Sequence, residues 1–501
     1  MNVGLPNWYR TMRCREHLRS GQLVRFHDQI QLSIKTNRVL PSGRTAAILT
    51  FGTFQTRFAS AAHGSRLIAC VFLPFALGYY LAYLFRTING LISGRLSADA
   101  GLGSADLGLI TSVYFLVLAA AQIPIGVLLD RYGPRRVQSA LLLVAAAGAG
   151  LFATSTDFIS LLVGRAMIGL GVAASLTAGL KAIVLWFPRE RVALLSGYMI
   201  MLGSLGAVTA TAPAEQLLAW ISWQQLFVLL AAATAATAVL IYFLVPDRAI
   251  SLSTTSNPGT LKDVFQDRRF WRIAPLSATC VGSAWSLQAL WAAPWLTDVE
   301  GLDRASLVRQ LFIMSIVLCG AALLFGTTLH RIRRRGVTTE AVLVATAVLF
   351  IAAELALILR APLPSIMPWS AVAIVGAATV ISFAVIADYF PPELVGRANG
   401  ALNVLHFGWA FLAQYATGLI VAQWSAEHGH ASVLAYQVAF GLNVAVQIAA
   451  FVWFALPWLR FLTSWIRTFA FGPVCDSDAL EPVDMHEQAI RPIPAEDDAE
   501  W

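Results

Sequence analysis

Twelve long apolar runs constrain the fold of this chain more than any other feature of its sequence. Each run is long enough, or nearly so, to cross a bilayer as a helix, which takes about 20 residues. Charged residues make up only 13% of the chain, whereas a soluble protein carries about 25%. The sequence therefore predicts an all-helical membrane protein. The runs cover residues 67–94, 107–129, 137–155, 158–181, 194–213, 225–246, 271–296, 307–329, 339–360, 368–388, 400–424 and 435–457.

Charged residues in the turns between these runs predict how the chain is oriented in the membrane. The turns after even-numbered runs carry most of the cations: Arg131, Arg135, Arg136, Arg189, Arg191, Arg248, Lys262, Arg268, Arg269, Arg331, Arg333, Arg334, Arg335 and Arg397. The turns after odd-numbered runs carry most of the acids: Asp99, Asp106, Asp157, Glu215, Asp298, Glu300, Asp303 and Glu427. Because cytoplasmic loops are rich in Lys and Arg, we expect both termini in the cytoplasm and the protein in the cell inner (plasma) membrane. The net charge of +7 lies mainly in these turns, so nucleic acid is not an expected partner.

The chain also repeats part of its own pattern. Residues 187–197 carry Phe, Pro, Glu, Val and Gly at the same spacing as residues 390–400. Gly126 and the arginine-rich turn after it are echoed by Gly326 and residues 330–336 at nearly the same offset. Two echoes at nearly the same offset predict two related six-helix halves, with a binding site between them near the middle of the membrane.

The repeat and the composition together predict the domain organisation. We expect an N-terminal six-helix bundle at 67–246, a central cytoplasmic linker at 247–270 and a C-terminal six-helix bundle at 271–457. Residues 1–66 hold ten Lys or Arg against two acids and no run long enough to span, which predicts a basic, disordered cytosolic extension. Residues 458–501 predict a short helix in the membrane interface and then an acidic cytosolic tail.

A densely charged turn, residues 126–136, separates the second and third runs. A loop that obeys only the positive-inside rule would explain its arginines, but not its acid or its glycines. The turn resembles the loop between helices 2 and 3 of the major facilitator superfamily of secondary transporters, whose pattern is G-x-x-x-D-R-x-G-x-R-R. The resemblance implies two pseudo-symmetric bundles that alternate access to a central site, with this turn latching the cytoplasmic side. The matching residues are Gly126, Asp130, Arg131, Gly133, Arg135 and Arg136.

Arg86 lies inside the first apolar run. A lone arginine at bilayer depth costs about 2.5–3.5 kcal/mol, so it should face water or a partner. No acid lies within one helical turn of Arg86, and an anionic substrate would balance its charge; the alternative is an acid or a helix C-terminus in the other half. The stretch resembles helix 1 of organic-anion and sugar-phosphate porters of that superfamily, where Tyr83 and Arg86 match the pattern and Asn89 follows one turn later. Those relatives carry an acid where Phe85 stands here, which argues against proton coupling through this helix.

Arg165, with Gly169 and Gly171, resembles the Arg-x-x-x-Gly-x-Gly segment of helix 4 in the same superfamily. In some relatives this arginine takes part in proton coupling, and in others it is part of the scaffold. Both roles stay open here. The small residues predict close helix packing.

The second half supplies further candidate substrate-binding residues. The seventh run is the repeat partner of the first, so Gln288 and Trp291 should lie opposite Arg86 and form a wall for an organic anion. Asn403 and His406 lie in the eleventh run, and His406 could exchange a proton near neutral pH. Ordinary packing is the alternative for each of these residues. We expect Glu354, in the ninth run, to lie near the outer boundary and to be exposed.

These features favour a secondary transporter, a symporter that carries a small organic anion with a proton or sodium ion. An exporter of amphiphilic compounds on the same fold is the alternative within this class, and a non-transporting sensor or assembly protein is the alternative outside it. An enzyme is not expected, because the runs show no spacing typical of a nucleophile and its base. No cofactor or metal site is expected, since the five cysteines are scattered. We expect a monomer surrounded by membrane lipid.

Overall fold

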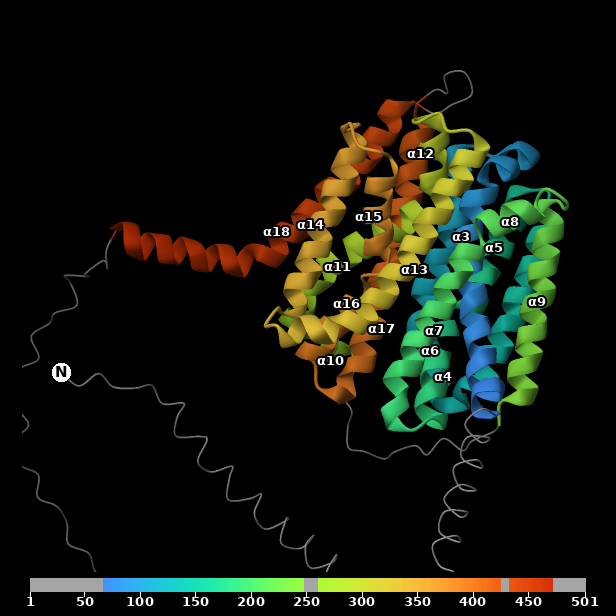
Figure 1. Ribbon diagram of the computed structural model, residues 1–501, viewed down its shortest axis with the longest axis horizontal. Helices are drawn as coiled ribbons and strands as arrows, with labels where there is room; N and C mark the ends of the chain where they lie inside the picture. The colour runs from blue at the N-terminus through green and yellow to red at the C-terminus, as the bar shows by residue number, and fades with distance from the viewer. Residues whose placement is uncertain (1–65, 247–259, 425–431, 472–501) are drawn as a thin grey trace, which may run out of the picture. The chain divides into compact units, whose positions relative to one another are not determined.

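The computed structural model describes residues 66–246, 260–424 and 432–471. Residues Leu67–Trp501 form one compact unit, separate from Met1–Arg66. Every regular element of the described residues is a helix (Figure 1). The predicted N-terminal extension, most of the linker and the acidic tail lie outside the described residues.

The described residues confirm the expected number of membrane-crossing helices. Ten helices among them are long and apolar enough to span a bilayer. One of these, α4 (Ser104–Thr154), consists of two membrane-crossing helices. Gly133 separates them with non-helical dihedral angles, φ 81° and ψ 162°. A further span is formed by α11 (Arg268–Ser286), η3 (Leu287–Trp291) and α12 (Ala292–Asp298), which follow one another without a loop. With α4 divided and this span added, the described part of the chain has twelve.

Gly133 explains why the charged turn of residues 126–136 needs a glycine at that position. A φ of 81° lies in the left-handed region, where a side chain other than hydrogen meets the backbone. The chain can therefore reverse there within a few residues and start the next span.

The remaining elements follow in chain order. The first half also contains η2 (Ile68–Phe72), α3 (Leu73–Ala100), α5 (Phe158–Val172), α6 (Ser175–Trp186), α7 (Arg189–Thr209), α8 (Ala212–Leu217) and α9 (Trp223–Leu244). The second half also contains α10 (Leu261–Gln266), α13 (Arg304–Arg334), α14 (Thr339–Ile358), α15 (Ile366–Gly376), α16 (Thr379–Tyr389), α17 (Pro392–Ala422) and α18 (Val433–Phe471). The stretch predicted as an interfacial helix is helical and belongs to α18. Its position relative to the membrane surface stays a prediction.

Acidic residues start several helices at one end of the molecule, which we call the acidic end (top of Figure 1). Asp157 caps α5 and Asp303 caps α13, while Asp106 lies in the first turn of α4. A carboxylate at a helix N-terminus satisfies free N–H groups and offsets the helix dipole. Hydrogen bonds from Ser160 and Ser306 lower the pKa of Asp157 and of Asp303, respectively, so both stay ionised in mildly acidic solution. The opposite end, with residues 126–136 and 330–336, is the basic end.

Small residues allow the helices of the first half to pack closely, as the sequence predicts. A Cβ atom built on Gly164 would lie 2.9 Å from the backbone nitrogen of Phe152 in α4. A Cβ atom on Gly169 would lie 2.8 Å from the carbonyl oxygen of Tyr114. Such contacts are too short for any larger residue, so these glycines fix α5 directly against α4.

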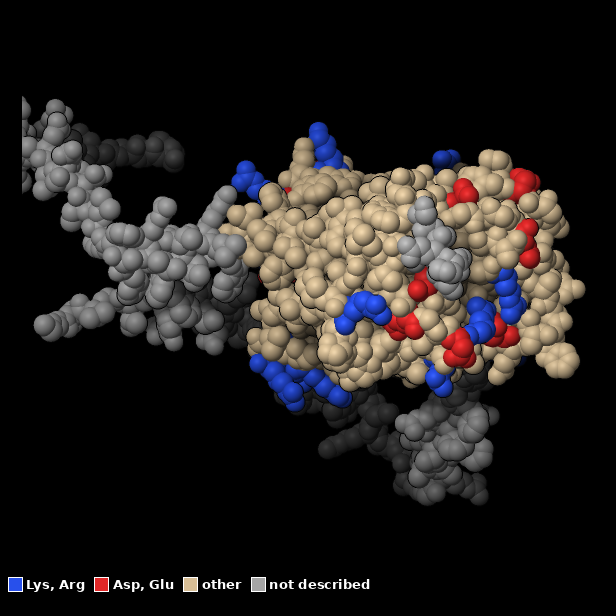
Figure 2. Space-filling model, turned by 90° about the horizontal axis from the view of Figure 1, so that it is seen from above, with Lys and Arg blue, Asp and Glu red and all other residues tan. Residues whose placement is uncertain are grey.

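The surface agrees with a membrane environment. Figure 2, which looks onto the acidic end, shows that most visible residues are uncharged and that basic and acidic side chains lie next to one another in a few groups. Large apolar side chains such as Phe243 and Val184 are exposed on the helices. In water such side chains would be costly, whereas lipid chains accept them.

Candidate functional site

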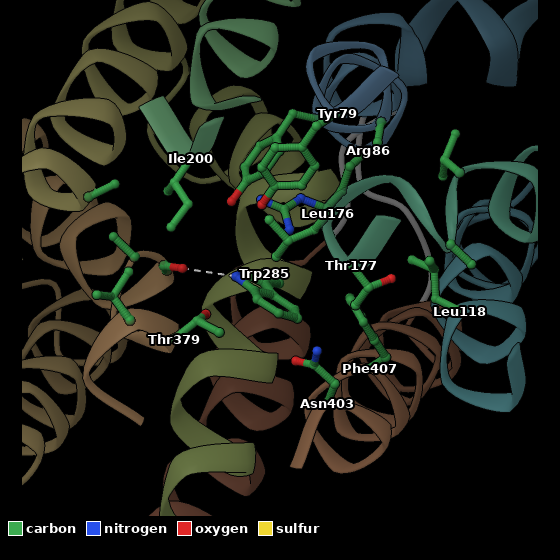
Figure 3. Close-up of a pocket in the computed structure, with 18 of the residues that line it drawn as sticks. Tyr79, Arg86, Leu118, Leu176, Thr177, Ile200, Trp285, Thr379, Asn403 and Phe407 are labelled. Carbon is green, nitrogen blue, oxygen red and sulfur yellow. Dashed lines mark hydrogen bonds between the residues drawn. The ribbon is translucent and has the colours of Figure 1, made fainter. Parts of the chain in front are cut away.

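A cavity of about 210 Å³ lies between the two halves of the molecule (Figure 3). Its lining comes from α3, α4, α5, α6 and α7 of the first half and from α11, α13, α15, α16 and α17 of the second. Several lining residues lie where two helices follow one another within a span, as Leu176 at the start of α6 and Gly376 at the end of α15 do. No Asp or Glu is among the described residues that line it.

Arg86 is the charged residue of this cavity. Its guanidinium carbon lies 4.0 Å from the ring centroid of Tyr83 and 5.0 Å from that of Trp285. Arg86 is partly exposed, and Figure 3 shows its side chain pointing towards Trp285. Among the described residues it forms neither an ion pair nor a hydrogen bond. The alternative in which an acid of the second half neutralises Arg86 is therefore not found in the described part of the chain.

Aromatic rings surround this guanidinium from both halves. Tyr79 and Tyr83 of α3 meet edge to face, with centroids 5.1 Å apart. Trp285 of α11 packs against Phe407 of α17 at 5.0 Å, and its Nε1 donates a hydrogen bond of 2.9 Å to the carbonyl oxygen of Gly376. That bond fixes the indole, so one of its faces stays available to Arg86. Cation–π contacts of this kind contribute about 0.5–2 kcal/mol each, less than a charged partner supplies.

A second guanidinium lies behind the cavity wall. Arg165 is 1% exposed, and its guanidinium carbon lies 4.6 Å from the ring centroid of Tyr114. The Tyr114 hydroxyl donates to the carbonyl oxygen of Ala82 at 3.1 Å, and its ring lines the cavity. The Nε and Nη1 atoms of Arg165 have no hydrogen-bond partner among the described residues. Both guanidinium groups therefore give the cavity a positive electrostatic potential. Arg165 does so from behind the ring of Tyr114, which lines the cavity.

The structure brings together only some of the predicted site residues. Tyr83, Arg86 and Asn403 line the cavity. Asn89 is buried outside this lining, and neither side-chain amide atom has a partner among the described residues. His406 is also buried, with Nε2 2.8 Å from the Ser277 hydroxyl and its ring behind Trp285.

The two predicted residues of the seventh span lie nearer the acidic end than this cavity. Gln288 donates from Nε2 to the carbonyl oxygen of Val372 at 3.1 Å and lines a separate, smaller cavity. Trp291 is buried and donates to the carbonyl oxygen of Gln414 at 3.1 Å. In this conformation both residues hold helices together, and a substrate in the cavity does not reach them.

Several lining residues were not among the predicted ones, namely Tyr79, Tyr114, Trp285 and Phe407. Tyr79 could have been found, because Tyr79, Tyr83 and Arg86 are four and three residues apart and share one helix face. Nothing in the sequence distinguishes Tyr114, which follows Val113, or Phe407, which follows His406. Only the meeting of α4 and α17 with α3 makes them part of a site.

An ion-pair cluster joins the two halves at the acidic end. Glu215 of α8 accepts from Arg95 of α3 at 3.1 Å and from Nη2 of Arg304 of α13 at 2.5 Å. Arg304 also donates to the carbonyl oxygen of Leu91 in α3 at 3.0 Å. Arg304 therefore ties the second half to two elements of the first.

A glycine crossing lies beneath this cluster. A Cβ atom built on Gly108 of α4 would lie 3.2 Å from Cα of Gly418 in α17. These contacts hold the two halves together at the acidic end.

Replacing Arg304 with alanine is expected to weaken this closure modestly. The side chain is 41% exposed, and exposed ion pairs contribute about 0.2–1 kcal/mol each. We expect a change of a few-fold in the exchange rate of reconstituted protein, and a smaller difference at high salt because ions screen the wild-type pair. Arg309→Ala is the control, since Arg309 is exposed on the same helix and bonds only Ser306 among the described residues. Equal effects of the two variants would contradict a role of Arg304 in closure.

The charged turn at the basic end forms contacts inside the first half. Asp130 accepts a bond of 2.6 Å from the ammonium group of Lys181, which also donates to the carbonyl oxygen of Leu129. Arg135 donates to the carbonyl oxygen of Tyr242 at 2.8 Å. In the second half, Arg333 pairs with Asp388 at 2.8 Å. Each half thus has its own cross-helix ion pair at this end, and the predicted latch through Asp130 stays a prediction for the conformation in which this end is closed.

Comparisons with known proteins agree with this architecture. Residues 75–413 match the model of the Major Facilitator Superfamily. The chain is 37% identical over 112 residues to the nitrate/nitrite transporter NrtP of Picosynechococcus sp., an alignment that covers 22% of this chain and 21% of that protein. It is 24% identical over 246 residues to the hexuronate transporter of Escherichia coli, covering 45% of this chain and 57% of that protein. Both alignments thus span less than two thirds of the relative.

A solved structure shows the same fold. A bacterial homologue of the human lysosomal transporter Spinster, in an inward-facing and unoccupied conformation, superposes with a TM-score of 0.62. The comparison covers 78% of this chain and 97% of the other at 18% sequence identity, so it supports the fold alone. Because the family model covers most of the chain and the twelve spans form the two expected halves, this chain belongs to the major facilitator superfamily of membrane transporters.

Proposed function

We propose that this protein is a secondary active transporter that carries a small organic anion together with a coupling cation, by alternating access. The observation that supports the anion is Arg86, a guanidinium in the central cavity with no carboxylate partner among the described residues. A bound anion would supply the missing countercharge and could accept two parallel N–H bonds from the guanidinium. The relatives named for nitrate and hexuronate transport are consistent with an anionic cargo.

The rest of the cavity fits an organic rather than a purely inorganic anion. The rings of Tyr79, Tyr83 and Trp285 offer flat apolar surface beside the guanidinium. Such rings pack against the carbon skeleton of a ligand, while their polar atoms bond its hydroxyl groups. Asn403 on the opposite wall adds an amide that can both donate and accept (Figure 3).

The arrangement of contacts supports a transport cycle in which the basic end opens to the cytoplasm. The acidic end is closed by the Glu215 cluster and by the crossing of Gly108 and Gly418. We infer that a substrate enters or leaves through the basic end in this conformation. Rocking the two halves about the cavity would exchange the open end for the closed one. The positive-inside rule supports cytoplasmic termini and the inner membrane as the location of the protein.

An exporter of amphiphilic compounds is the competing function on this fold. The aromatic walls suit such compounds as well, since cations also bind aromatic faces. A cationic substrate would however meet Arg86 without an acid to offset it in the described lining.

A thermal-shift screen of the purified protein tests the proposal. The compounds are mono- and dicarboxylates, sugar acids such as glucuronate, phosphate esters and nitrate, with neutral sugars and quaternary amines as controls. A ligand present at about 100 times its Kd stabilises the folded state by about 2.7 kcal/mol, so a true substrate should raise the melting temperature. Stabilisation by amines and by no anion would contradict the anion proposal.

A further inference from the structure

A buried carboxyl group lies in the second half, away from the central cavity. Glu354 of α14 is 0% exposed, and among the described residues it is the sole Asp or Glu that is buried. The expectation from the sequence, exposure near the outer boundary, is therefore wrong. Although Glu354 lies four residues before the end of α14, it is buried there and bonded by two side chains of α18. A carboxyl group in such a place is costly unless hydrogen bonds or a function maintain it.

Two amide groups of α18 hold this carboxyl group. Asn443 donates from Nδ2 to Oε1 of Glu354 at 2.7 Å, and Gln447 donates from Nε2 to Oε2 at 2.6 Å. No Lys, Arg or His lies within ion-pair distance of it among the described residues. The carboxyl group is thus stabilised by neutral donors alone, and its charge has no permanent partner.

A chain of hydrogen bonds connects Glu354 to the helix that forms the cavity wall. Trp409 donates to the hydroxyl of Ser283 at 2.8 Å, and this hydroxyl donates to Oδ1 of Asn443 at 2.7 Å. Every donor in the chain points towards the carboxyl group, an order that strengthens each bond when the group is ionised. Ser283 is two residues from Trp285, the contact of Arg86, and lies just before the π-helical turn η3. The hydrogen bonds therefore link Glu354 to the segment of α11 that contains Trp285.

The same cluster contains a hydrogen-bond acceptor that a protonated Glu354 could use. The Oε1 atom of Gln447 is buried and has no hydrogen-bond partner among the described residues. Rotating this amide by half a turn would bring that oxygen to Glu354 in place of the N–H group. It could then accept the O–H of a protonated carboxyl group. The cluster can therefore satisfy Glu354 in both charge states without moving a helix.

We propose that Glu354 is the site at which this transporter takes up and releases the coupling cation, and that this cation is a proton. The proposal rests on the proposed function, since it needs cation-coupled transport. The position in helix 1 where related porters carry an acid is Phe85, and no described acid lines the cavity, so the proton needs a carboxyl group elsewhere. A sodium ion would need several oxygen ligands, whereas both side chains that bond Glu354 present N–H groups to it.

Few other ionisable groups face this site. Cys280 of α11 interacts electrostatically with Glu354. The helix α15 contributes no ionisable side chain, and Asp388 of α16 lies at the basic end in its pair with Arg333. Tyr436 of α18 bonds Asp298 at the acidic end. At the other end of α14, Glu340 pairs with Arg272 at 3.8 Å, which makes it a suitable control.

Infrared difference spectra of the full-length protein in lipid nanodiscs test protonation directly and need no substrate. We expect the wild type to show a carboxylic C=O band that appears and disappears on pH titration. We expect Glu354→Gln, which keeps the size and hydrogen bonding of the side chain, to lack it. Glu340→Gln should keep the band. A wild type without a titrating buried carboxyl band, or the same band in Glu354→Gln, would overturn the proposal.

Transport measurements then test coupling, with radiolabelled glucuronate as the probe in proteoliposomes. A gradient of one pH unit can drive about tenfold accumulation of a substrate carried with one proton, because one pH unit is a tenfold ratio of protons. We expect Glu354→Gln to lose this accumulation and to keep probe exchange within a few-fold of wild type. Accumulation that survives in Glu354→Gln, or that follows a sodium gradient instead, would refute the assignment. If the wild type does not exchange glucuronate, the proposed substrate class is in error for this probe, and the infrared titration still decides the role of Glu354.

Discussion

Replacing Arg86 with alanine is expected to reduce the affinity for the anionic substrate by about 30-fold or more. Truncating one partner of a desolvated charge pair costs about 2–5 kcal/mol, and each 1.4 kcal/mol is a factor of ten in binding. The loss should be measurable as the disappearance of the ligand-induced thermal shift and of substrate uptake into proteoliposomes. Arg86→Lys should fall between wild type and alanine, because lysine keeps the charge but not the planar fork of donors.

The stability of the ligand-free protein separates binding from a structural role for Arg86. The guanidinium has two aromatic contacts and no ion pair among the described residues, so its removal takes an unneutralised charge out of the membrane. The ligand-free melting temperature of Arg86→Ala should therefore equal or exceed that of the wild type. A marked decrease would show that Arg86 supports the fold, and a thermal shift that survives in Arg86→Ala would remove it from the site. Arg309→Ala is again the control.

Replacing Gly108 with leucine is expected to stop transport by holding the acidic end open. In the structure α4 and α17 cross so closely that even a Cβ atom on Gly108 would lie 3.2 Å from Cα of Gly418. A Cβ atom on Gly418 would lie 2.8 Å from the carbonyl oxygen of Ser104. A leucine therefore forces the two backbones apart at the point where the halves meet. Uptake should fall close to background, while the ligand-induced thermal shift persists because the cavity residues are intact.

Cysteine labelling measures this change of conformation. Thr87 lies on the acidic-end side of the central cavity, in the smaller cavity that also contains Gln288. In a background with all native cysteines replaced by serine, Thr87→Cys should react with a membrane-impermeant maleimide far faster when Gly108→Leu is present. Gly150→Leu is the matched control, since Gly150 is also in α4 and has open space around it. Wild-type uptake by Gly108→Leu would show that this crossing does not close the cavity.

The local sequence was sufficient for residues whose role depends on one helix. The apolar runs predict the spans, because a helix in lipid must satisfy its own backbone and cover itself with apolar side chains. Arg86 stands out for the same reason, since a charge inside such a run needs water or a partner wherever the helix lies. Gly133 could be predicted as a turn residue, because a left-handed φ is a property of a single position.

Residues whose role depends on contacts between helices were harder to predict. Gln288 and Trp291 were expected in the cavity, since their helix is the repeat partner of the first. In the structure, bonds to carbonyl groups of α15 and α17 direct these side chains away from it. Trp285, one turn earlier, takes the place opposite Arg86. The helical periodicity of a sequence shows which residues share one face of a helix. It does not show which turn of that helix contacts the other half of the molecule.

By itself, the sequence determined that this protein is a twelve-helix transporter of two related halves with a lone arginine in its first span. Those properties follow from hydrophobic length, repeated pattern and the cost of a charge in lipid, all of which act within one segment. The tertiary structure alone decided that Arg86 faces a cavity between the halves and that the acidic end is closed. It also decided that Glu354 is enclosed by amides of α18. The reason is that burial and hydrogen bonding depend on atoms brought together from distant parts of the chain, and no single stretch of sequence contains both partners.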